Sequence, residues 1–600
     1  MKKAKKEQKQ GFIPIVKTLS KSIREYKKPS ILTPIMVMLE VIFECLIPFV
    51  MTMLLDKINK ISQGESGDLM SEILTYGLIL LAIAFVALVF GALSGKFCAT
   101  ASSGFAKNLR KDLYYKIQGF SFVNIDKFST SSLVTRLTTD ITNVEMSYMM
   151  LIRIAVRAPF MLIFSLTMAF TINWTMALIF LCTSPILIVG LFIIIRKAVP
   201  FFNRIFHKYD KLNESVEENV RGMRVVKSYV REDYEKEKFE KASGEVKNDF
   251  TKAEKLIAFN TPLMNFCIYA GIILIFVVGS ILIINSNESV LAIAELQSFM
   301  TYSFQILMSL MMLSMILVMI VMSSASAKRI TEVLNESSTI YSPENAITEI
   351  TDGSIEFTDV CFRYSEKADR FALSDINLKI ESGETVGIIG STGSSKTTLV
   401  QLIPRLYDTT SGTVKVANVN VKDYDLTALR DSVAMVLQKN TLFSGTIKEN
   451  LRWGNKFATD EELVNACKLA QADEFIQAFP EGYDTYIEQG GVNVSGGQKQ
   501  RLCIARALLK KPKILILDDS TSAVDTKTDA LIRKAFKEYI PETTKIIIAQ
   551  RINSVMDADK IIIMDGGTIT AIGTHEQLLN NNEIYQELYY SQNKEEAKNA

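Results

Sequence analysis

Six long apolar stretches dominate the pattern of hydrophobic and polar positions before residue 325. Each reaches roughly the 20 residues that a helix needs to cross a lipid bilayer. Helices buried in a large soluble core are also apolar, but six such stretches in succession favour membrane-spanning helices. The predicted spans cover residues 31–55, 73–95, 151–172, 174–196, 260–284 and 297–322.

The segments that connect these stretches alternate in basic charge. Residues 1–30 carry ten Lys and Arg and residues 96–150 carry seven, whereas residues 55–72 carry only two. Because loops rich in Lys and Arg stay on the cytoplasmic side, the N-terminus is predicted to be cytoplasmic. Six crossings then return the C-terminal half to the cytoplasm. We therefore expect a multi-pass protein of the cell membrane, of the bacterial plasma-membrane type.

The same pattern predicts the domain organisation. A cytoplasmic N-terminus (1–30) precedes a transmembrane domain (31–325), a linker (326–352), a soluble domain (353–590) and a polar tail (591–600). In the first segment, apolar positions at helical spacing alternate with lysines, which predicts a short helix lying on the inner membrane surface. The two long cytoplasmic loops of the transmembrane domain are helical in pattern and highly charged. They predict helices that continue beyond the bilayer.

Composition narrows the chemistry of the chain. The net charge of +2 lacks the basic excess of a nucleic-acid-binding protein, so no nucleic-acid partner is expected. The two histidines, His207 and His575, argue against any site that needs a pair of His ligands. The seven cysteines are scattered and form no CxxC, which argues against a disulfide framework or a zinc site.

A phosphate-binding loop follows the strand-like sequence TVGIIG in the soluble domain. A strand, a Gly-bearing loop, a Lys-Thr pair and a helix form the arrangement in which backbone amides and a helix N-terminus hold phosphate. Lys396 would reach the β- and γ-phosphate oxygens, and Thr397 would bind Mg²⁺. Ser395 stands where the usual pattern has Gly, and its Cβ is expected to tighten the loop, so the other residues of the motif do not fix the nucleotide affinity by themselves. The predicted nucleotide contacts are Gly390, Ser391, Thr392, Gly393, Ser394, Ser395, Lys396, Thr397 and Thr398.

Two further motifs accompany this loop. The apolar run 514–517 ends in Asp518, the carboxylate expected to hold Mg²⁺ together with Thr397. Between the two lies the sequence VSGGQ, followed by KQR. These motifs, in this order and with these separations, resemble the ATP-binding cassette (ABC) family. The resemblance covers both halves of the chain, because six membrane helices ahead of one such cassette is the layout of an exporter.

The resemblance implies an all-α transmembrane domain of six helices, of the type IV exporter kind, fused to an α/β P-loop nucleotide-binding domain. It implies ATP and Mg²⁺ as cofactors. It assigns Tyr364 to adenine stacking, and it assigns Gln438 to a loop that links Mg²⁺ and the attacking water to the membrane domain. It also assigns Ser522–Asp525 to the loop that connects the two nucleotide sites of a dimer.

The signature sequence of the family falls in the same domain. It comprises Ser495, Gly496, Gly497 and Gln498. The resemblance implies that these residues contact the γ-phosphate held by the opposite subunit, and their hydroxyl, amides and helix N-terminus suit an anion. The segments 128–145 and 212–232 resemble the cytoplasmic loop regions whose short coupling helices press on the nucleotide-binding domains.

The sequence departs from the family pattern at two catalytic positions. Asp519 follows Asp518 where active members have Glu, which positions and polarises the attacking water. Its shorter side chain would place the carboxylate on the order of 1.5 Å further away, and a misplaced general base typically costs about 10²–10⁴ in rate. Gln550 replaces a His that contacts the γ-phosphate, and an amide cannot carry a proton there.

This combination resembles one subunit of a heterodimeric multidrug exporter. Its own site would bind ATP and hydrolyse it slowly, while Ser495–Gln498 would serve the competent site of a partner with intact Glu and His. Neutral drift within one active enzyme is the alternative. Other functions left open are lipid or peptide export, import through an exporter-like fold, and a regulatory, nucleotide-sensing role.

Candidate cargo residues lie in the first and sixth spans. Glu40 and Glu44 share one helix face near mid-bilayer, where a charge is costly. They would either attract cationic cargo or form a hydrogen-bonded pair inside the bundle. The sixth span carries soft side chains suited to an apolar cavity for hydrophobic or amphipathic molecules, or to plain packing. These are Phe304, Met308, Met312 and Met315.

Overall fold

A computed structural model describes residues 12–62, 68–286, 291–365, 368–520 and 523–599 of the chain. The chain forms two compact units. One contains Met1–Gly119 and Phe128–Glu336, and we call it the membrane unit. The other contains Phe120–Lys127 and Ser337–Ala600, and we call it the nucleotide unit.

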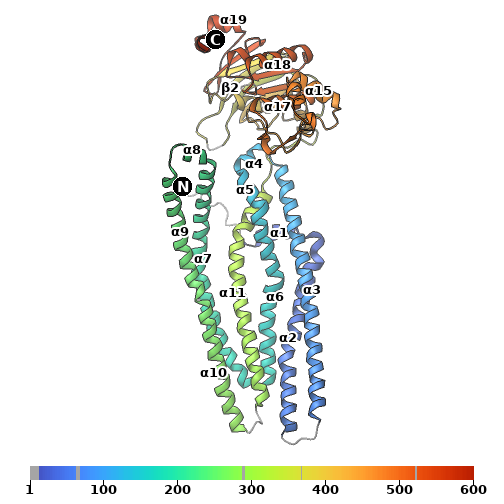
Figure 1. The fold of residues 1–600 in the computed structure, drawn as a ribbon, viewed down its shortest axis with the longest axis vertical. Helices are drawn as coiled ribbons and strands as arrows, with labels where there is room; N and C mark the ends of the chain where they lie inside the picture. The colour runs from blue at the N-terminus through green and yellow to red at the C-terminus, as the bar shows by residue number, and fades with distance from the viewer. Residues whose placement is uncertain (1–11, 63–67, 287–290, 366–367, 521–522, 600) are drawn as a thin grey trace. The chain divides into compact units, whose positions relative to one another are not determined.

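The membrane unit is entirely helical in its described residues (Figure 1). Its long helices are α2 (Lys27–Ser62), α3 (Leu69–Gln118), α6 (Ile141–Ile172), α7 (Trp174–Arg221), α9 (Glu232–Ala258), α10 (Asn260–Ser286) and α11 (Ile293–Asn335). Its short helices are α1 (Phe12–Ser20), η2 (Arg24–Tyr26), α5 (Thr130–Thr135), η3 (Arg136–Asp140) and α8 (Met223–Ser228). Within the described ranges, six helical stretches are long and apolar enough to cross a membrane, and α9 and α10 share one of them.

Several of these helices continue well past their apolar segments. α3 has 50 residues and α11 has 43. The first ten positions of the segment expected to be a linker therefore belong to the end of α11. Ile330 and Val333 remain buried there. Arg329 also forms an ion pair with Asp140, at 2.8 Å between Nε and Oδ2. Packing and charge pairing thus extend the helix beyond the span that hydropathy identifies.

The nucleotide unit is built on two larger sheets. A six-stranded sheet has the order β12-β11-β3-β10-β9-β6, and a four-stranded sheet has the order β2-β1-β4-β5. The strands are β1 (Ile355–Phe362), β2 (Leu373–Ile380), β3 (Thr385–Gly390), β4 (Ser411–Val416), β5 (Val419–Asn420), β6 (Val433–Val436), β9 (Ile514–Asp518), β10 (Thr544–Ile548), β11 (Lys560–Asp565) and β12 (Thr568–Gly573). A small sheet pairs β7 (Gly445–Thr446) with β8 (Tyr486–Ile487).

Helices and short turns connect these strands. They are α4 (Phe122–Lys127), α12 (Lys396–Gln401), α13 (Leu426–Ser432), α14 (Ile447–Leu451), α15 (Asp460–Leu469), α16 (Asp473–Gln477), η4 (Gly482–Asp484), η5 (Gln489–Gly491), α17 (Gly496–Leu509), α18 (Thr526–Tyr539), η6 (Ile552–Ser554), α19 (His575–Asn581) and α20 (Glu583–Asn599). The last positions of the chain, expected to be a polar tail, lie in α20 as far as Asn599.

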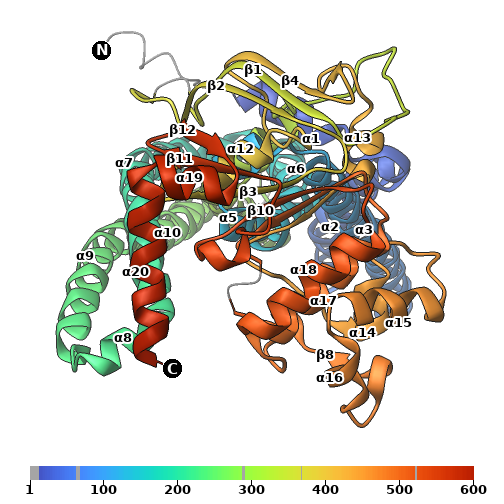
Figure 2. The same ribbon diagram turned by 90° about the horizontal axis from the view of Figure 1, so that it is seen from above.

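The central strands are mostly apolar because both of their faces are covered. β3, β9 and β10 run parallel to one another. Ile388 faces a core shared with the four-stranded sheet, and Ile389 faces a core shared with α17. Figure 2 shows these two layers on either side of β3 and β10. In such open parallel sheets, ligands bind at the carboxyl ends of the strands, where β3 and β9 end in Gly390 and Asp518.

Candidate nucleotide-binding site

The phosphate loop joins the end of β3 to the start of α12. Gly390 has φ +152°, and a Cβ there would lie 2.0 Å from the carbonyl oxygen of Met564 on the neighbouring strand. Ser395, directly before α12, is in the left-handed conformation with φ +68° and ψ 24°. A residue with a Cβ pays roughly 1–2 kcal/mol for that conformation. The loop thus keeps the turn that glycine favours, with backbone strain at Ser395.

Lys396 lies at the first position of α12, and its ammonium group folds back into the loop. Its Nζ donates to the carbonyl oxygens of Gly390 and Ser391, at 2.9 and 2.8 Å, and to Ser394 Oγ at 3.2 Å. Burial lowers the pKa of Lys396, and the nearby carboxylates of Asp518 and Asp519 oppose this shift. Hydrogen bonds between ionised partners are about twice as strong as neutral ones. Phosphate oxygens would therefore satisfy this half-buried ammonium better than the neutral acceptors of the loop.

Thr397 and Asp518 meet beside the lysine. The Thr397 hydroxyl lies 3.0 and 2.9 Å from the two carboxylate oxygens of Asp518, which is 2% exposed. Burial raises the pKa of Asp518, and the hydrogen bond from Thr397 opposes that shift. A hydroxyl and a buried carboxylate side by side are the hard oxygen ligands that Mg²⁺ prefers. These two predicted metal ligands therefore fit the ion.

The third predicted metal ligand, Gln438, contacts a different carboxylate. Its Nε2 lies 3.3 Å from Asp519 Oδ2, and Gln550 Nε2 lies 2.9 Å from the same oxygen. The two positions at which the sequence departs from the family pattern are thus in direct contact. The cluster lies at the ends of β9 and β10, next to the Thr397–Asp518 pair. Both amide groups donate to the same carboxylate oxygen of the candidate general base.

Tyr364, the predicted adenine-stacking residue, is 50% exposed. Its hydroxyl is hydrogen-bonded to Thr398 Oγ1 at 2.8 Å, which ties the ring to α12. Its other neighbours are Phe362 and Tyr407, whose rings meet it edge to face with centroids 4.9 and 5.2 Å away. This packing fixes the orientation of the ring on the buried side.

Tyr407 connects this aromatic cluster to α4, and the sequence reasoning missed it. Its hydroxyl donates to Asp126 Oδ2 at 2.6 Å, and its ring packs against Phe122 with centroids 5.9 Å apart. Burial, followed by the hydrogen bond to Asp126, raises the pKa of Tyr407. α4 precedes the segment 128–145 that was expected to supply the coupling helix, and it belongs to the nucleotide unit. The only sequence signal for this contact is an aromatic residue beyond the phosphate-loop helix.

The signature residues form the N-terminus of α17. Ser495 Oγ accepts from the backbone N–H of Gln498 at 3.3 Å, and Gln498 Oε1 accepts from that of Ser495 at 2.9 Å. This reciprocal cap leaves the amides of Gly496 and Gly497 at the helix end, where an anion is favoured. A Cβ on Gly497 would lie 2.9 Å from the carbonyl oxygen of Ala523, so glycine is needed for this close approach.

In the loop after Asp519, Ser522 lies outside the described residues. Asp525 caps α18 by accepting from the backbone N–H of Thr528 at 2.9 Å. Of the remaining phosphate-loop residues, Thr392 and Gly393 are exposed, and Ser391 donates to Asp565 Oδ1 at 3.0 Å.

The candidate cargo residues lie in the membrane unit. Phe304, Met308, Met312 and Met315 on α11 are 45%, 44%, 38% and 60% exposed, respectively. Met312 and Met315 line a cavity of about 380 Å³ next to α6. Glu40 and Glu44 on α2 both pair with Arg157 of α6.

A six-helix membrane unit joined to a nucleotide unit with this phosphate loop defines a transporter powered by a nucleotide. Comparisons with known proteins agree. A profile of the family described as "ABC transporter transmembrane region" matches residues 30–310, and one described as "ABC transporter" matches residues 373–522. The chain belongs to the ABC transporter family.

Individual relatives match along nearly the whole chain. The ABC transporter ATP-binding protein YfiB of Bacillus subtilis is 35% identical over 96% of this chain and 98% of its own length. The putative ABC transporter ATP-binding protein MG014 of Mycoplasma genitalium is 30% identical over 94% of this chain and 96% of its own. A solved structure of a bacterial Atm1-family ABC exporter with ATP bound is similar in fold, with a TM-score of 0.81 and 21% identity. It covers 95% of this chain and 98% of its own.

These findings confirm the predicted fold class of six membrane helices followed by an α/β nucleotide-binding domain. The chain is a membrane protein that binds ATP and couples its hydrolysis to transport. The roles of individual site residues stay predictions, now with a geometry attached to each.

Proposed function

We propose that the chain is one subunit of a heterodimeric exporter that moves hydrophobic or amphipathic compounds, including drugs, out of a bacterial cell. It would lie in the plasma membrane with both termini in the cytoplasm. Its partner would be a second half-transporter that has the catalytic Glu and His. The chain's own site would hold nucleotide and hydrolyse it slowly.

The observation that carries this proposal is the arrangement around Asp519. Two amide groups, from Gln438 and Gln550, donate to its Oδ2 atom at 3.3 and 2.9 Å. A general base needs an oxygen that is free to accept a proton from water, within about 2.6–3.2 Å of it. Here one of the two carboxylate oxygens already accepts from two amide donors, and the side chain is one methylene shorter than Glu. Both features weaken the same proton transfer.

By contrast, the residues predicted to bind phosphate and Mg²⁺, Lys396, Thr397 and Asp518, lie together. Bound ATP with Mg²⁺ would supply the charge that Lys396 and Asp518 are arranged to meet. The lysine offers an ammonium with only neutral acceptors, and Thr397 with Asp518 offers paired oxygen ligands. A site that binds well and hydrolyses slowly would hold two nucleotide-binding domains together for longer than one cycle.

The signature sequence also supports a role toward a partner. Ser495 and Gln498 are hydrogen-bonded to each other, which holds the N-terminus of α17 in place, with Gly496 exposed and Gly497 half-buried. A chain that had lost function altogether would have no reason to keep this arrangement beside an altered catalytic pair. We infer that Ser495–Gln498 serve the nucleotide held by the partner.

The test is the ATPase rate of the full-length chain purified alone, against the double variant Asp519→Glu/Gln550→His. We expect slow hydrolysis by the wild type and a gain of about 10²–10⁴-fold in the variant, the usual contribution of a positioned general base. Adding Lys396→Ala to the double variant must abolish the gain, which excludes a contaminating ATPase. Robust hydrolysis by the wild type alone would refute the proposal.

The direction of transport needs a separate measurement. Inside-out vesicles that contain the chain and its partner should accumulate an amphipathic dye when ATP is added. ATP-driven uptake by right-side-out vesicles instead would assign the chain to import.

A further inference from the structure

The membrane unit contains a cavity of about 380 Å³ between α6 and α11. Its wall is made of methionine and isoleucine side chains, among them Met312 and Met315, and of two arginines, Arg153 and Arg157. The arginines are the only charged residues that line it in the described part of the chain. The cavity is therefore apolar with a cationic spot.

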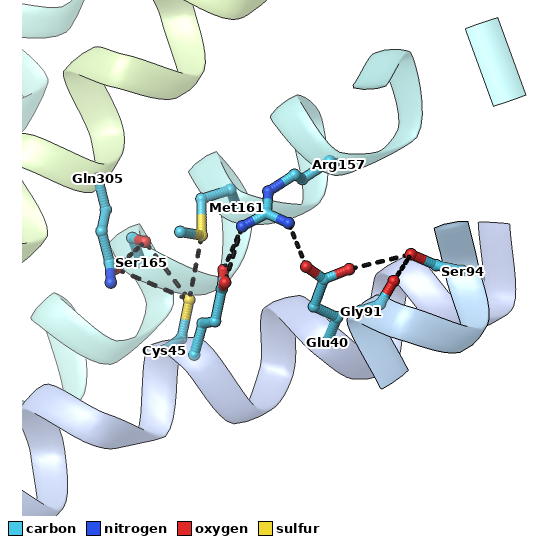
Figure 3. A network of polar contacts seen from close by, with 9 residues as sticks. Glu40, Cys45, Gly91, Ser94, Arg157, Met161, Ser165 and Gln305 are labelled. Carbon is cyan, nitrogen blue, oxygen red and sulfur yellow. Dashed lines mark hydrogen bonds and ion pairs between the residues drawn. The ribbon is translucent and has the colours of Figure 1, made fainter. Parts of the chain in front are cut away.

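The charge of Arg157 is neutralised by two carboxylates that do not line the cavity. Its guanidinium lies 2.5 Å from Glu40 Oε1 and 2.7 Å from Glu44 Oε2, as Figure 3 shows for the network around Glu40. Glu40 also accepts from Ser94 Oγ of α3 at 3.3 Å. A Cβ at Gly91 would lie 3.1 Å from Glu40 Oε1, so this glycine gives the carboxylate its room. Neither glutamate lines the cavity, so cationic cargo would meet arginines there before any carboxylate.

Arg153 lies one turn before Arg157 on the same face of α6. Within the described ranges no carboxylate pairs with it, and its guanidinium lies near α3, where a Cβ on Gly95 would be 3.8 Å from its NH1 atom. Arginine keeps its charge in proteins, and an unpaired charge beside apolar surface is costly. An anion bound in the cavity would pair with it.

We propose that this cavity binds a small amphipathic organic anion, with its acidic group on Arg153 and its apolar body against Met312 and Met315. The proposal rests on the proposed transport function and names the class of cargo. A volume of about 380 Å³ fits one drug-sized ligand, since such pockets span about 300–1,000 Å³. Methionine side chains adapt to apolar bodies of different shape. The cavity therefore has room for one small amphipathic molecule.

The test compares two probes with the same tail and opposite charge. Radiolabelled decyl sulfate and decyltrimethylammonium, both as monomers, are dialysed against the full-length chain in nanodiscs of zwitterionic lipid. We expect decyl sulfate to bind at least about tenfold more tightly, because one charge-assisted hydrogen bond contributes that much. Equal binding, or a preference for the cation, would overturn the proposal without any variant.

Variants then assign the site. Arg153→Gln should reduce the affinity for decyl sulfate about tenfold, and Arg153→Lys should keep most of it. Arg196→Gln, at an exposed position on α7, is the matched control and should change nothing. An unchanged affinity in Arg153→Gln would reject the assignment. Displacement of decyl sulfate by phosphatidylglycerol in the disc would make the occupant a lipid and would reject it too.

This binding assay needs neither ATP hydrolysis nor the partner. Its outcome is therefore independent of the vesicle experiment that tests export. Anion-selective binding without vesicle transport would reject the proposed function and leave the cavity assignment in place. Vesicle transport without anion-selective binding would reject the cavity assignment and leave the proposed function in place.

Discussion

Replacing Ser395 by glycine is expected to stabilise the nucleotide unit. Ser395 has φ +68°, which costs a residue with a Cβ roughly 1–2 kcal/mol relative to an ordinary conformation. Glycine adopts this φ freely but loses about 0.5–1 kcal/mol more conformational entropy on folding. The net gain for Ser395→Gly therefore lies between about 0 and 1.5 kcal/mol.

Thr392→Gly separates strain from glycine entropy. Thr392 is an exposed residue of the same loop and has no positive φ, so glycine there brings the entropic loss alone. Each substitution changes the free energy of unfolding, and the entropic loss of glycine is common to both. Subtracting one change from the other therefore leaves the strain at Ser395, about 1–2 kcal/mol. In a domain of this size, 1 kcal/mol shifts the Tm by about 2–4 °C. The two variants should thus differ by about 2–8 °C.

The fluorescence of the two tryptophans makes the assay specific. Trp174 lies in the membrane unit and Trp453 lies in the nucleotide unit, stacked on Phe443 with ring centroids 4.1 Å apart. In a Trp174→Phe background, thermal unfolding of the full chain without nucleotide therefore reports on the nucleotide unit. Equal Tm values for Ser395→Gly and Thr392→Gly would show that the phosphate loop carries no strain at Ser395.

Two further predictions concern contacts that the sequence did not reveal. Tyr407→Phe removes a hydrogen bond to a carboxylate, about 1.5–3 kcal/mol, so amide hydrogen exchange in 122–127 should rise at least about tenfold. Unchanged exchange would mean that α4 is held by its apolar contacts alone. Arg157→Met should destabilise the membrane unit by about 3–5 kcal/mol, because it leaves two unpaired carboxylates. Adding Glu40→Gln and Glu44→Gln should restore most of the loss in a denaturation assay, and failure of that rescue would place the role of Arg157 elsewhere.

The sequence predicts the fold class because the signals for it are local. Apolar runs of bilayer length mark the spans, and a continuous apolar run such as residues 514–517 of β9 marks a sheet that is covered on both faces. The phosphate loop and its Mg²⁺ ligands are also recognisable, since a few fixed spacings place Lys396, Thr397 and Asp518 together. The end of α11 is harder to predict from the sequence. The burial of Ile330 and Val333 and the ion pair between Arg329 and Asp140 both depend on other helices.

Contacts between distant segments could not be predicted in this way. Glu40 and Arg157 are 117 residues apart, and Asp126 and Tyr407 are 281 apart. Each residue alone has an ordinary explanation, such as an arginine at a membrane surface or a tyrosine in a core. The role inferred for each residue changes only when its partner in the fold is known. The carboxylates of α2 allowed two interpretations, attraction of cationic cargo or a structural pair inside the bundle, and their ion pairs with Arg157 favour the structural one.

The contact between Asp519 and Gln550 changes how the two catalytic departures should be counted. Taken one at a time, each is a weakened residue, and drift in an active enzyme could produce either. Their hydrogen bond of 2.9 Å makes them one unit, and substitutions in contact are usually non-additive by 0.5–3 kcal/mol. Asp519→Glu alone would push a longer carboxylate toward the amide of Gln550, and Gln550→His alone would remove a donor from the shorter one. If the two reversals acted independently, the rate gains of the two single variants would multiply to the gain of the double variant. We therefore expect the product of the two single gains to be much smaller than the gain of the double variant. Such a pattern would mean that the site is adapted to hold nucleotide and has not merely lost a base.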